Sequence, residues 1–187
     1  MIDRETRRSE VEDKLAAHVL AHGLGRTSVR DLAAAAGTSD RMLLYYFADK
    51  AEVVSVVLAR IAADMAQALD AALPEGERLP PADLLARVGV MASSAAMRPY
   101  MELWSEIAAK AGREEAPFAA IADAIAAGFR AWADSRLAIA DDARRSAMAA
   151  LMIVAIDGAA LLAPMAGGTI ARDGLALLGE LLDGHCS

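Results

Sequence analysis

The segment between Ser28 and Phe47 constrains the fold of this chain most, because it holds two short helical patterns joined at one glycine. The first pattern repeats apolar residues with the i, i+3, i+4, i+7 spacing of a helix that buries one face, at Val29, Leu32, Ala33 and Ala36. Gly37 ends this helix, and a second one of about eight residues follows. Two short helices that meet at a small residue predict a helix-turn-helix.

Start signals for both helices are present in the sequence. Ser28 can cap the first helix while Asp31, three residues later, reaches back to it, which is a capping box. The second helix has three candidate N-caps in a row, at Thr38, Ser39 and Asp40.

The second helix has an inward and an outward face. Leu43 and Phe47 are four residues apart and should point into the domain. With the same helical period, Arg41, Leu44 and Tyr45 should lie on the outward face, and Tyr46 should lie near the border between the two faces. An outward face of polar and aromatic groups is what a helix-turn-helix needs on its second helix.

The remainder of the chain also predicts helices. Alanine, the best helix former, supplies 46 of the 187 residues, whereas only ten valines and nine isoleucines favour strands. Start and stop signals divide this remainder into helices over residues 4–22, 50–72, 82–96, 99–111, 116–136, 141–163 and 170–182. The first of these has its buried stripe at Val11, Leu15, Val19 and His22 and stops at Gly23. We therefore expect an all-α protein of about nine helices.

Charge divides the chain into two parts. Residues 1–50 carry eight bases and eight acids, whereas residues 51–187 carry eleven bases and eighteen acids and thus the whole net charge of −7. We call residues 1–50 the head and residues 51–187 the body. A neutral head that contains bases, joined to an acidic body, is expected when only the head contacts a polyanion. We place one domain over residues 1–50, with a linking helix to about residue 72, and a second over residues 51–187. The clearest break after the linking helix is the proline-rich segment 74–81.

Residues that carry catalysis or hold metals are scarce. The single cysteine, Cys186, excludes a disulfide framework and a cysteine zinc site. His18 and His22 have the i, i+4 spacing of two metal ligands, but no third ligand is near in sequence, so we expect a structural role. The sequence offers no activated nucleophile and no glycine-rich phosphate loop. We expect no enzyme, no metal and no cofactor.

One segment raises the question of a membrane. Residues 146–166 carry a single charge, Asp157, which falls mid-run and costs roughly 2.5–3.5 kcal/mol on insertion scales. The segment is rich in alanine and glycine rather than leucine, so we expect a helix buried in a core or an interface and no membrane. Residues 1–14 are too densely charged for a secretory signal, and we expect a cytoplasmic protein.

Residues 26–54, RTSVRDLAAAAGTSDRMLLYYFADKAEVV, resemble the DNA-binding domain of the TetR family of transcriptional regulators. The resemblance covers about residues 7–65 and rests on matches at fixed spacing: Gly23, Thr27, Ser28, Asp31, Leu32, Ala33, Ala36, Gly37, Ser39, Leu43, Tyr45, Phe47 and Lys50. The rest of the chain resembles the family only in the number and length of its helices. The resemblance implies a DNA-binding domain over residues 1–50 and an effector-binding and dimerisation domain over residues 51–187.

The resemblance also implies a set of DNA contacts. Matched position by position, they are Ser28, Arg30, Thr38, Ser39, Asp40, Arg41, Tyr45, Tyr46 and Lys50. Thr38 and Ser39 match the turn that contacts a phosphate, and Lys50 matches a lysine that binds a phosphate. The tyrosine pair matches aromatic groups that lie against the sugar-phosphate backbone.

Three positions depart from the pattern of the family and leave the operator sequence open. The family usually has glycine where Arg41 stands, tyrosine where Leu44 stands and histidine where Tyr46 stands. Asp40 and Arg41 match the base-reading positions of the second helix. We expect Arg41 to read a base, because arginine can bond O6 and N7 of guanine together.

In the family the C-terminal helices form a ligand cavity and a dimer interface. Bulky, adaptable side chains suited to an apolar pocket are Met65, Met97, Tyr100, Met101, Trp104, Phe129 and Trp132, although the same residues also suit a plain core. Glu102, Glu106 and Asp157 lie in apolar surroundings that face either a pocket or a partner. An acidic body with apolar walls favours a neutral or cationic, largely apolar effector. The counter-argument is that Arg98, Arg113 or Arg130, if turned inward, could hold a carboxylate.

The last two long helices predict a homodimer. Residues 141–163 are apolar almost all round, and a helix of that kind must be buried, most economically against a second copy. We therefore expect a dimeric repressor that binds palindromic double-stranded DNA and leaves its operator when a small-molecule effector binds. The alternatives are a DNA-binding regulator without a small-molecule effector and, from another class, a small helical carrier of apolar ligands.

Overall fold

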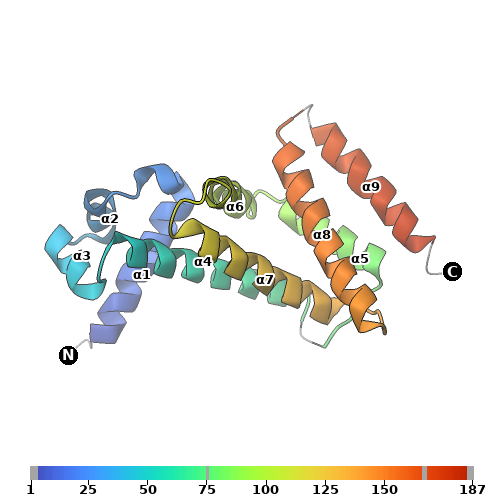
Figure 1. The fold of residues 1–187 in the computed structure, drawn as a ribbon, viewed down its shortest axis with the longest axis horizontal. Coiled ribbons are helices and arrows are strands. Elements are labelled where there is room, and N and C mark those ends of the chain that lie inside the picture. Colours follow the sequence, from blue (N-terminus) through green and yellow to red (C-terminus); the bar gives the residue numbers. More distant parts are fainter. Residues whose placement is uncertain (1–3, 75, 166–167, 185–187) are drawn as a thin grey trace. The chain divides into compact units, whose positions relative to one another are not determined.

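A computed structural model describes residues 4–74, 76–165 and 168–184 of the chain (Figure 1). Within these residues it has nine α-helices and one 3-10 turn: α1 (Arg4–His22), η1 (Leu24–Arg26), α2 (Val29–Ala36), α3 (Asp40–Tyr46), α4 (Lys50–Ala72), α5 (Pro81–Ala92), α6 (Arg98–Ala111), α7 (Phe118–Arg136), α8 (Asp142–Leu162) and α9 (Thr169–Asp183). The same residues form no strand, only an isolated bridge between Leu79 and Leu137. The prediction of an all-α protein with about nine helices is confirmed.

Most helix boundaries lie within two residues of their predicted places, with one clear exception. The helix predicted over residues 82–96 ends at Ala92, so its C-terminal bound was wrong. Ser93 closes it, because its backbone N–H and its hydroxyl both donate to the carbonyl of Gly89, at 3.1 and 2.8 Å. His22 was also misplaced, since it is exposed at the end of α1 while Val11, Leu15 and Val19 are buried. Cys186 lies outside the described residues.

The helices form two compact units. The first contains the chain up to Gln67 together with Glu102–Ile125, and the second contains Ala68–Met101 together with the chain from Ala126 onward. The first unit therefore continues past residue 50 and takes in most of α6, while the second is built on α5, α8 and α9. The functional division at residue 50 stays a prediction.

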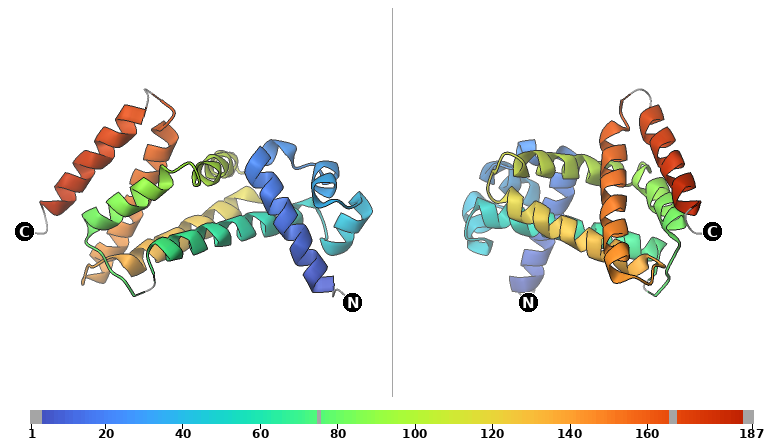
Figure 2. Two further views of the ribbon diagram at one scale, coloured as in Figure 1. Left: turned by 180° about the vertical axis from the view of Figure 1, so that it is seen from behind. Right: turned by 45° about the vertical axis from the view of Figure 1, so that its right-hand side comes forward.

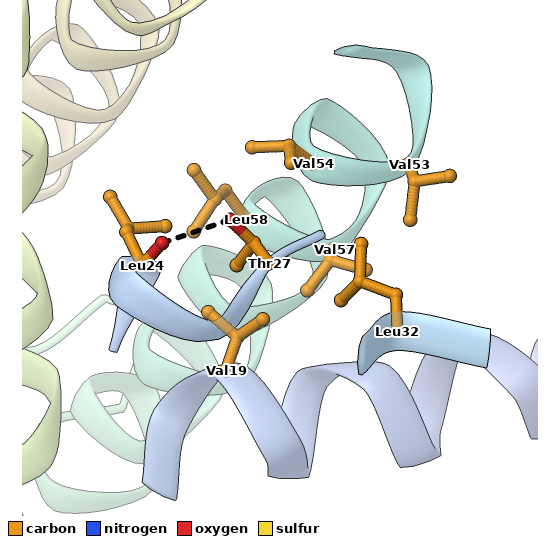
Figure 3. A pocket seen from close by; sticks show the side chains of 8 residues that line it. All are labelled: Val19, Leu24, Thr27, Leu32, Val53, Val54, Val57 and Leu58. Carbon is orange, nitrogen blue, oxygen red and sulfur yellow. Dashed lines mark hydrogen bonds between the residues drawn. The ribbon is translucent and has the colours of Figure 1, made fainter. Parts of the chain in front are cut away.

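The core of the first unit holds α1, α2, α3 and the start of α4 together. Figure 3 shows a seam in this core, lined by Val19, Leu24, Thr27, Leu32, Val53, Val54, Val57 and Leu58. These side chains pack so closely that the seam has no room for a water molecule. The only hydroxyl among them, on Thr27, donates to the carbonyl of Leu24 at 2.9 Å, so no polar group in the seam is left unsatisfied.

The core of the second unit is apolar with one buried cation at its edge. Its buried members are Leu73, Leu84, Leu85, Ala133, Leu137, Ala149 and Met152. Beside them the side chain of Arg136 is 6% exposed and pairs with Asp70 at 2.7 Å. The same carboxylate oxygen accepts the indole N–H of Trp132 at 2.8 Å, and Arg136 also donates to the carbonyl of Leu73. These bonds fasten the end of α4 to α7.

Helices α8 and α9 run side by side in opposite directions, with α5 packed against both (Figures 1 and 2). Each presents an outer row of apolar side chains at heptad-like spacing: Leu151, Val154 and Leu161 on α8, and Ile170, Leu177 and Leu181 on α9. All six are 41–69% exposed in the single chain. Gly158 and Gly174 lie in the same two rows, and a Cβ added at either would meet nothing within 4 Å. These exposed side chains form an apolar surface on α8 and α9.

The length and composition of α8 would also permit it to cross a membrane. A single helix of this kind is weak evidence, since core helices of soluble proteins pass the same test.

Candidate DNA-binding face

The turn between α2 and α3 has the geometry that the sequence predicts. Gly37 lies in the left-handed region at φ 69° and ψ 34°, a conformation in which a side chain would be strained. Its N–H donates to the carbonyl of Ala34 at 3.1 Å, and that of Thr38 donates to Ala33 at 2.9 Å, so two of the last four carbonyls of α2 are satisfied. The helix-turn-helix is confirmed.

Both helices begin at a serine cap. The Ser28 hydroxyl accepts the N–H of Asp31 at 3.1 Å and donates to the carboxylate of that residue. Ser39, one of three candidate caps, accepts the N–H of Met42 at 3.2 Å and so begins α3. The hydrogen bond that the Ser28 hydroxyl donates to the Asp31 carboxylate is the main cause that lowers the pKa of this carboxyl below its ordinary value. Ser28 and Ser39 therefore have a local structural role whether or not they also contact DNA.

The cap of α2 should make stability depend on pH. A lowered pKa in the folded state adds stability above the ordinary pKa of Asp31, and this stability is lost as pH falls through the folded value. Asp31→Asn should thus destabilise the protein at neutral pH by a margin that shrinks in acid. Ser28→Ala should cost about 1 kcal/mol and should also reduce the pH dependence of the Asp31→Asn effect, because it removes the largest of the causes that lower this pKa. Urea unfolding between neutral pH and about pH 3 checks both results, and a margin that grows in acid would contradict them.

Helix α3 has the two faces expected from its spacing. Leu43 and Phe47 are no more than 1% exposed, whereas Arg41, Leu44 and Tyr45 are exposed. Tyr46 is half-buried and meets the ring of Tyr45 edge to face at 5.5 Å between centroids. The outward face of α3 is therefore one arginine and one tyrosine set among apolar side chains.

Three bases of the predicted contact set are available to a polyanion. Arg30, Arg41 and Lys50 are exposed, and none forms a hydrogen bond or an ion pair within the part of the chain that the structure describes. Lys50 has two carboxylates near it in sequence, but the N–H of Glu52 bonds to Asp49 at 2.8 Å, and Glu52 accepts the N–H of Ala48 at 2.6 Å. These acids cap α4 instead of pairing with Lys50.

Helix α1 adds two arginines, one turn apart, that the sequence did not single out. Arg8 lies over the ring of Phe47 at 4.8 Å and forms ion pairs with Glu12 at 2.9 Å and Glu52 at 3.3 Å. The bond to Glu12, and then the charge of Glu52, raise the pKa of Arg8. Arg4 lies over the ring of Tyr45 at 4.9 Å. Only their spacing in the base-containing head could have drawn attention to them.

Helix α6 contacts the junction between α1 and α2 through one carboxylate. Glu106, predicted to face a pocket or a partner, accepts the backbone N–H of Leu24 at 2.8 Å. Gly23 next to it has φ 67°, and a Cβ there would lie 2.2 Å from Oε1 of Glu106. The junction thus fits one glycine and one carboxylate together.

The histidine pair has a structural arrangement. His18 and His22 stack with ring centroids 4.5 Å apart, and their ring nitrogens lie 3.0 Å from the carbonyls of Arg26 and His18 respectively. Within the residues that the structure covers, no cluster of three or more His, Cys, Asp or Glu side chains could hold a metal ion.

The predicted ligand-lining residues fall in both units. Met65 and Trp104 belong to the first, and Met97, Tyr100, Met101, Phe129 and Trp132 belong to the second. Met97 and Met101 are buried, and the other five are half-buried. The indole of Trp132 is held by Asp70, so this ring has a structural contact of its own. The ligand pocket stays a prediction.

The fold and the outward face of α3 define a class of protein, the DNA-binding regulators that use a helix-turn-helix. Residues 14–57 match the model of a family described as bacterial regulatory proteins, tetR family. Residues 14–57 of this chain are therefore similar to a domain of that family. No curated protein matches the chain.

Solved structures share the fold over almost the whole chain. A transcriptional regulator from Rhodococcus sp. RHA1 superposes with a TM-score of 0.71 at 21% identity, over 95% of this chain and 94% of that one. The multidrug binding protein EbrR, in complex with proflavin, gives 0.65 at 22% identity, over 92% and 99%. GusR from Salmonella enterica gives 0.67 at 17% identity, over 98% and 97%. At such identities the similarity shows a shared fold.

Proposed function

We propose that this protein is a cytoplasmic, dimeric repressor that binds a palindromic operator and is released from it by a small, largely apolar ligand. The outward face of α3 is the observation that carries the proposal. It exposes Arg41 and Tyr45, while Arg30 and Lys50 on the flanking helices have no ion pair within the described residues. Bases without a protein counter-ion suit the phosphate contacts on which DNA affinity depends.

The outer rows of α8 and α9 support the dimer. Six exposed apolar side chains in two parallel rows form a surface that a second copy of the chain can cover with its own rows. Burial of this kind is driven by about 25 cal/mol for each Å² of apolar surface removed from water. The two copies of α3 would then face successive turns of DNA, roughly 34–36 Å apart.

Three observations support a neutral or cationic effector rather than a carboxylate. Of the three arginines that could hold an anion, Arg113 is paired with Glu115 at 2.7 Å and Arg130 donates to Ser146 at 2.7 Å. The structural neighbour EbrR was solved with proflavin, a flat cationic dye. A cation also meets a favourable field at a body that carries all of the net charge of −7.

Selection from fragmented genomic DNA tests the proposed DNA binding. The protein should enrich a palindromic site, and its affinity for that site should fall steeply with salt. A carrier of apolar ligands would enrich no sequence, and that result would reject the proposal.

Thermal shift without DNA tests the effector, because proflavin itself binds DNA. A panel containing proflavin and salicylate should show stabilisation by the cation and none by the carboxylate. A saturating ligand at 100 times its Kd adds about 2.7 kcal/mol. Trp104→Ala should weaken the effect of proflavin, and Arg130→Ala should not. Stabilisation by salicylate that is lost in Arg130→Ala but kept in Trp104→Ala would contradict the effector class, and no response to any compound would favour a regulator without effector.

A further inference from the structure

We propose that Arg4, at the start of α1, is a further DNA-phosphate contact that acts beside Tyr45. This inference rests on the proposed DNA binding and adds to the contact set a residue from a different helix. It begins from the pair of arginines on α1, each of which lies over an aromatic ring of the α3 segment at nearly the same distance, 4.8 Å for Arg8 and 4.9 Å for Arg4.

The rings beneath the two arginines differ in exposure. Arg8 is bonded to the carboxylates of Glu12 and Glu52, and the ring beneath it, Phe47, is 1% exposed. Its charge is therefore neutralised, and it fastens α1 to α3 and α4. The ring beneath Arg4, by contrast, is Tyr45, which is 59% exposed on the outward face of α3.

A second contact fixes Arg4 at the end of α3. Its Nη2 donates to the carbonyl of Tyr45 at 3.5 Å, one of the last four carbonyls of a helix that ends at Tyr46. A cation at the C-terminal end of a helix also interacts favourably with the helix dipole. A guanidinium has five N–H donors in a fork, so it can hold a carbonyl and a phosphate together.

The position of the Tyr45 ring places the Arg4 guanidinium near the DNA backbone in the proposed complex. Tyr45 is predicted to lie against the sugar-phosphate backbone, which carries one phosphate about every 3.4 Å of helix axis on each strand. A cation stacked on that ring therefore lies at the level of the phosphates. Arg4 thus contributes affinity that does not depend on base sequence, in contrast to Arg41.

Salt dependence tests the assignment with two duplexes, the selected palindrome and a mixed-sequence duplex of equal length. Fluorescence anisotropy gives the Kd of the full-length dimer for each duplex between about 50 and 300 mM KCl. Arg4→Ala should weaken binding to both duplexes by the same factor, about tenfold at low salt, and lower the slope of log Kd against log salt by about one per protomer. Arg4→Lys should keep the slope.

Matched variants separate this contact from loss of structure. Arg8→Ala should lower the unfolding temperature but keep the salt slope, and Arg172→Ala on α9 should change neither. An unchanged slope in Arg4→Ala, with the wild type bound to both duplexes, would overturn the assignment of Arg4. Failure of the wild type to bind either duplex would instead reject the proposed function.

Discussion

Placing arginine at both Val154 and Leu177 should convert the protein to monomers and weaken its binding to a palindromic duplex by a factor of about 10²–10⁴. The two side chains are 69% and 56% exposed in the outer rows of α8 and α9, so the single chain should fold without them. In a dimer, two-fold symmetry would bring four new positive charges into one apolar surface. A monomer holds only one half-site and loses the gain that comes from linking two.

Sedimentation at micromolar concentration and anisotropy on the palindrome measure these two effects. The wild type should sediment at roughly twice the chain mass of 19.5 kDa, and the double variant at that mass. Val90→Arg places the same charge at an apolar position of α5 that is 76% exposed and should leave the dimer intact. A monomeric wild type would contradict the proposed interface.

Arg41→Ala should relax sequence specificity at one symmetric base-pair position by about 1–3 kcal/mol, while other positions keep their preference. Arg41 stands in the first turn of α3, exposed and without an ion pair in the described parts of the chain, as a base-reading side chain would. The Arg41→Lys variant should also lose discrimination, because an ammonium cannot bond O6 and N7 of guanine in the fork geometry of a guanidinium.

Competition binding against the palindrome and its single-base-pair variants checks this prediction. The wild type should penalise substitution at one symmetric pair, and Arg41→Ala should not. Equal loss of affinity for every duplex would show that Arg41 contacts a phosphate.

Local signals explain why the helix-turn-helix could be predicted so closely. Ser28 and Gly37 act within three or four residues of their own positions, as a cap and as a left-handed turn, so the sequence alone identifies them. Leu43 and Phe47 follow the helical period. The choice of Ser39 over Thr38 and Asp40 as the cap needed the structure, because all three residue types make good caps.

Contacts between distant residues could not be predicted in the same way. Glu106 bonds to a backbone group 82 residues away, and Arg136 pairs with Asp70 across 66 residues. No helical period or local motif in the sequence indicates either pair, because each depends on how whole helices pack against one another. Trp132 is a further example, because its size suits a pocket or a core, whereas the bond of its indole to Asp70, 62 residues away, could not be predicted.

The proposed dimer face, formed by the outer apolar rows of α8 and α9, could be predicted only in part. Helix α8 is apolar nearly all round, which predicts burial but not the side that a partner covers. Packing of α5 and α9 selects the side, since Ala149 and Met152 are buried in the core of the second unit while Val154 stays exposed. A sequence pattern without a polar face contains no information on that choice.

The fit between Gly23 and Glu106 limits how regulators of this kind can be recombined. An engineer who grafts residues 1–50 onto the C-terminal helices of another regulator removes the carboxylate that accepts the Leu24 amide. The reverse graft joins the DNA-binding domain of another regulator to the C-terminal helices of this chain. If that domain has a side chain at position 23, its Cβ lies against Glu106, which is retained. The carboxylate is the mobile end of its side chain and can move away, but it then gives up the Leu24 amide, so an exchange of the reading head keeps this contact only when positions 23 and 106 are transferred together, although more than eighty residues separate them.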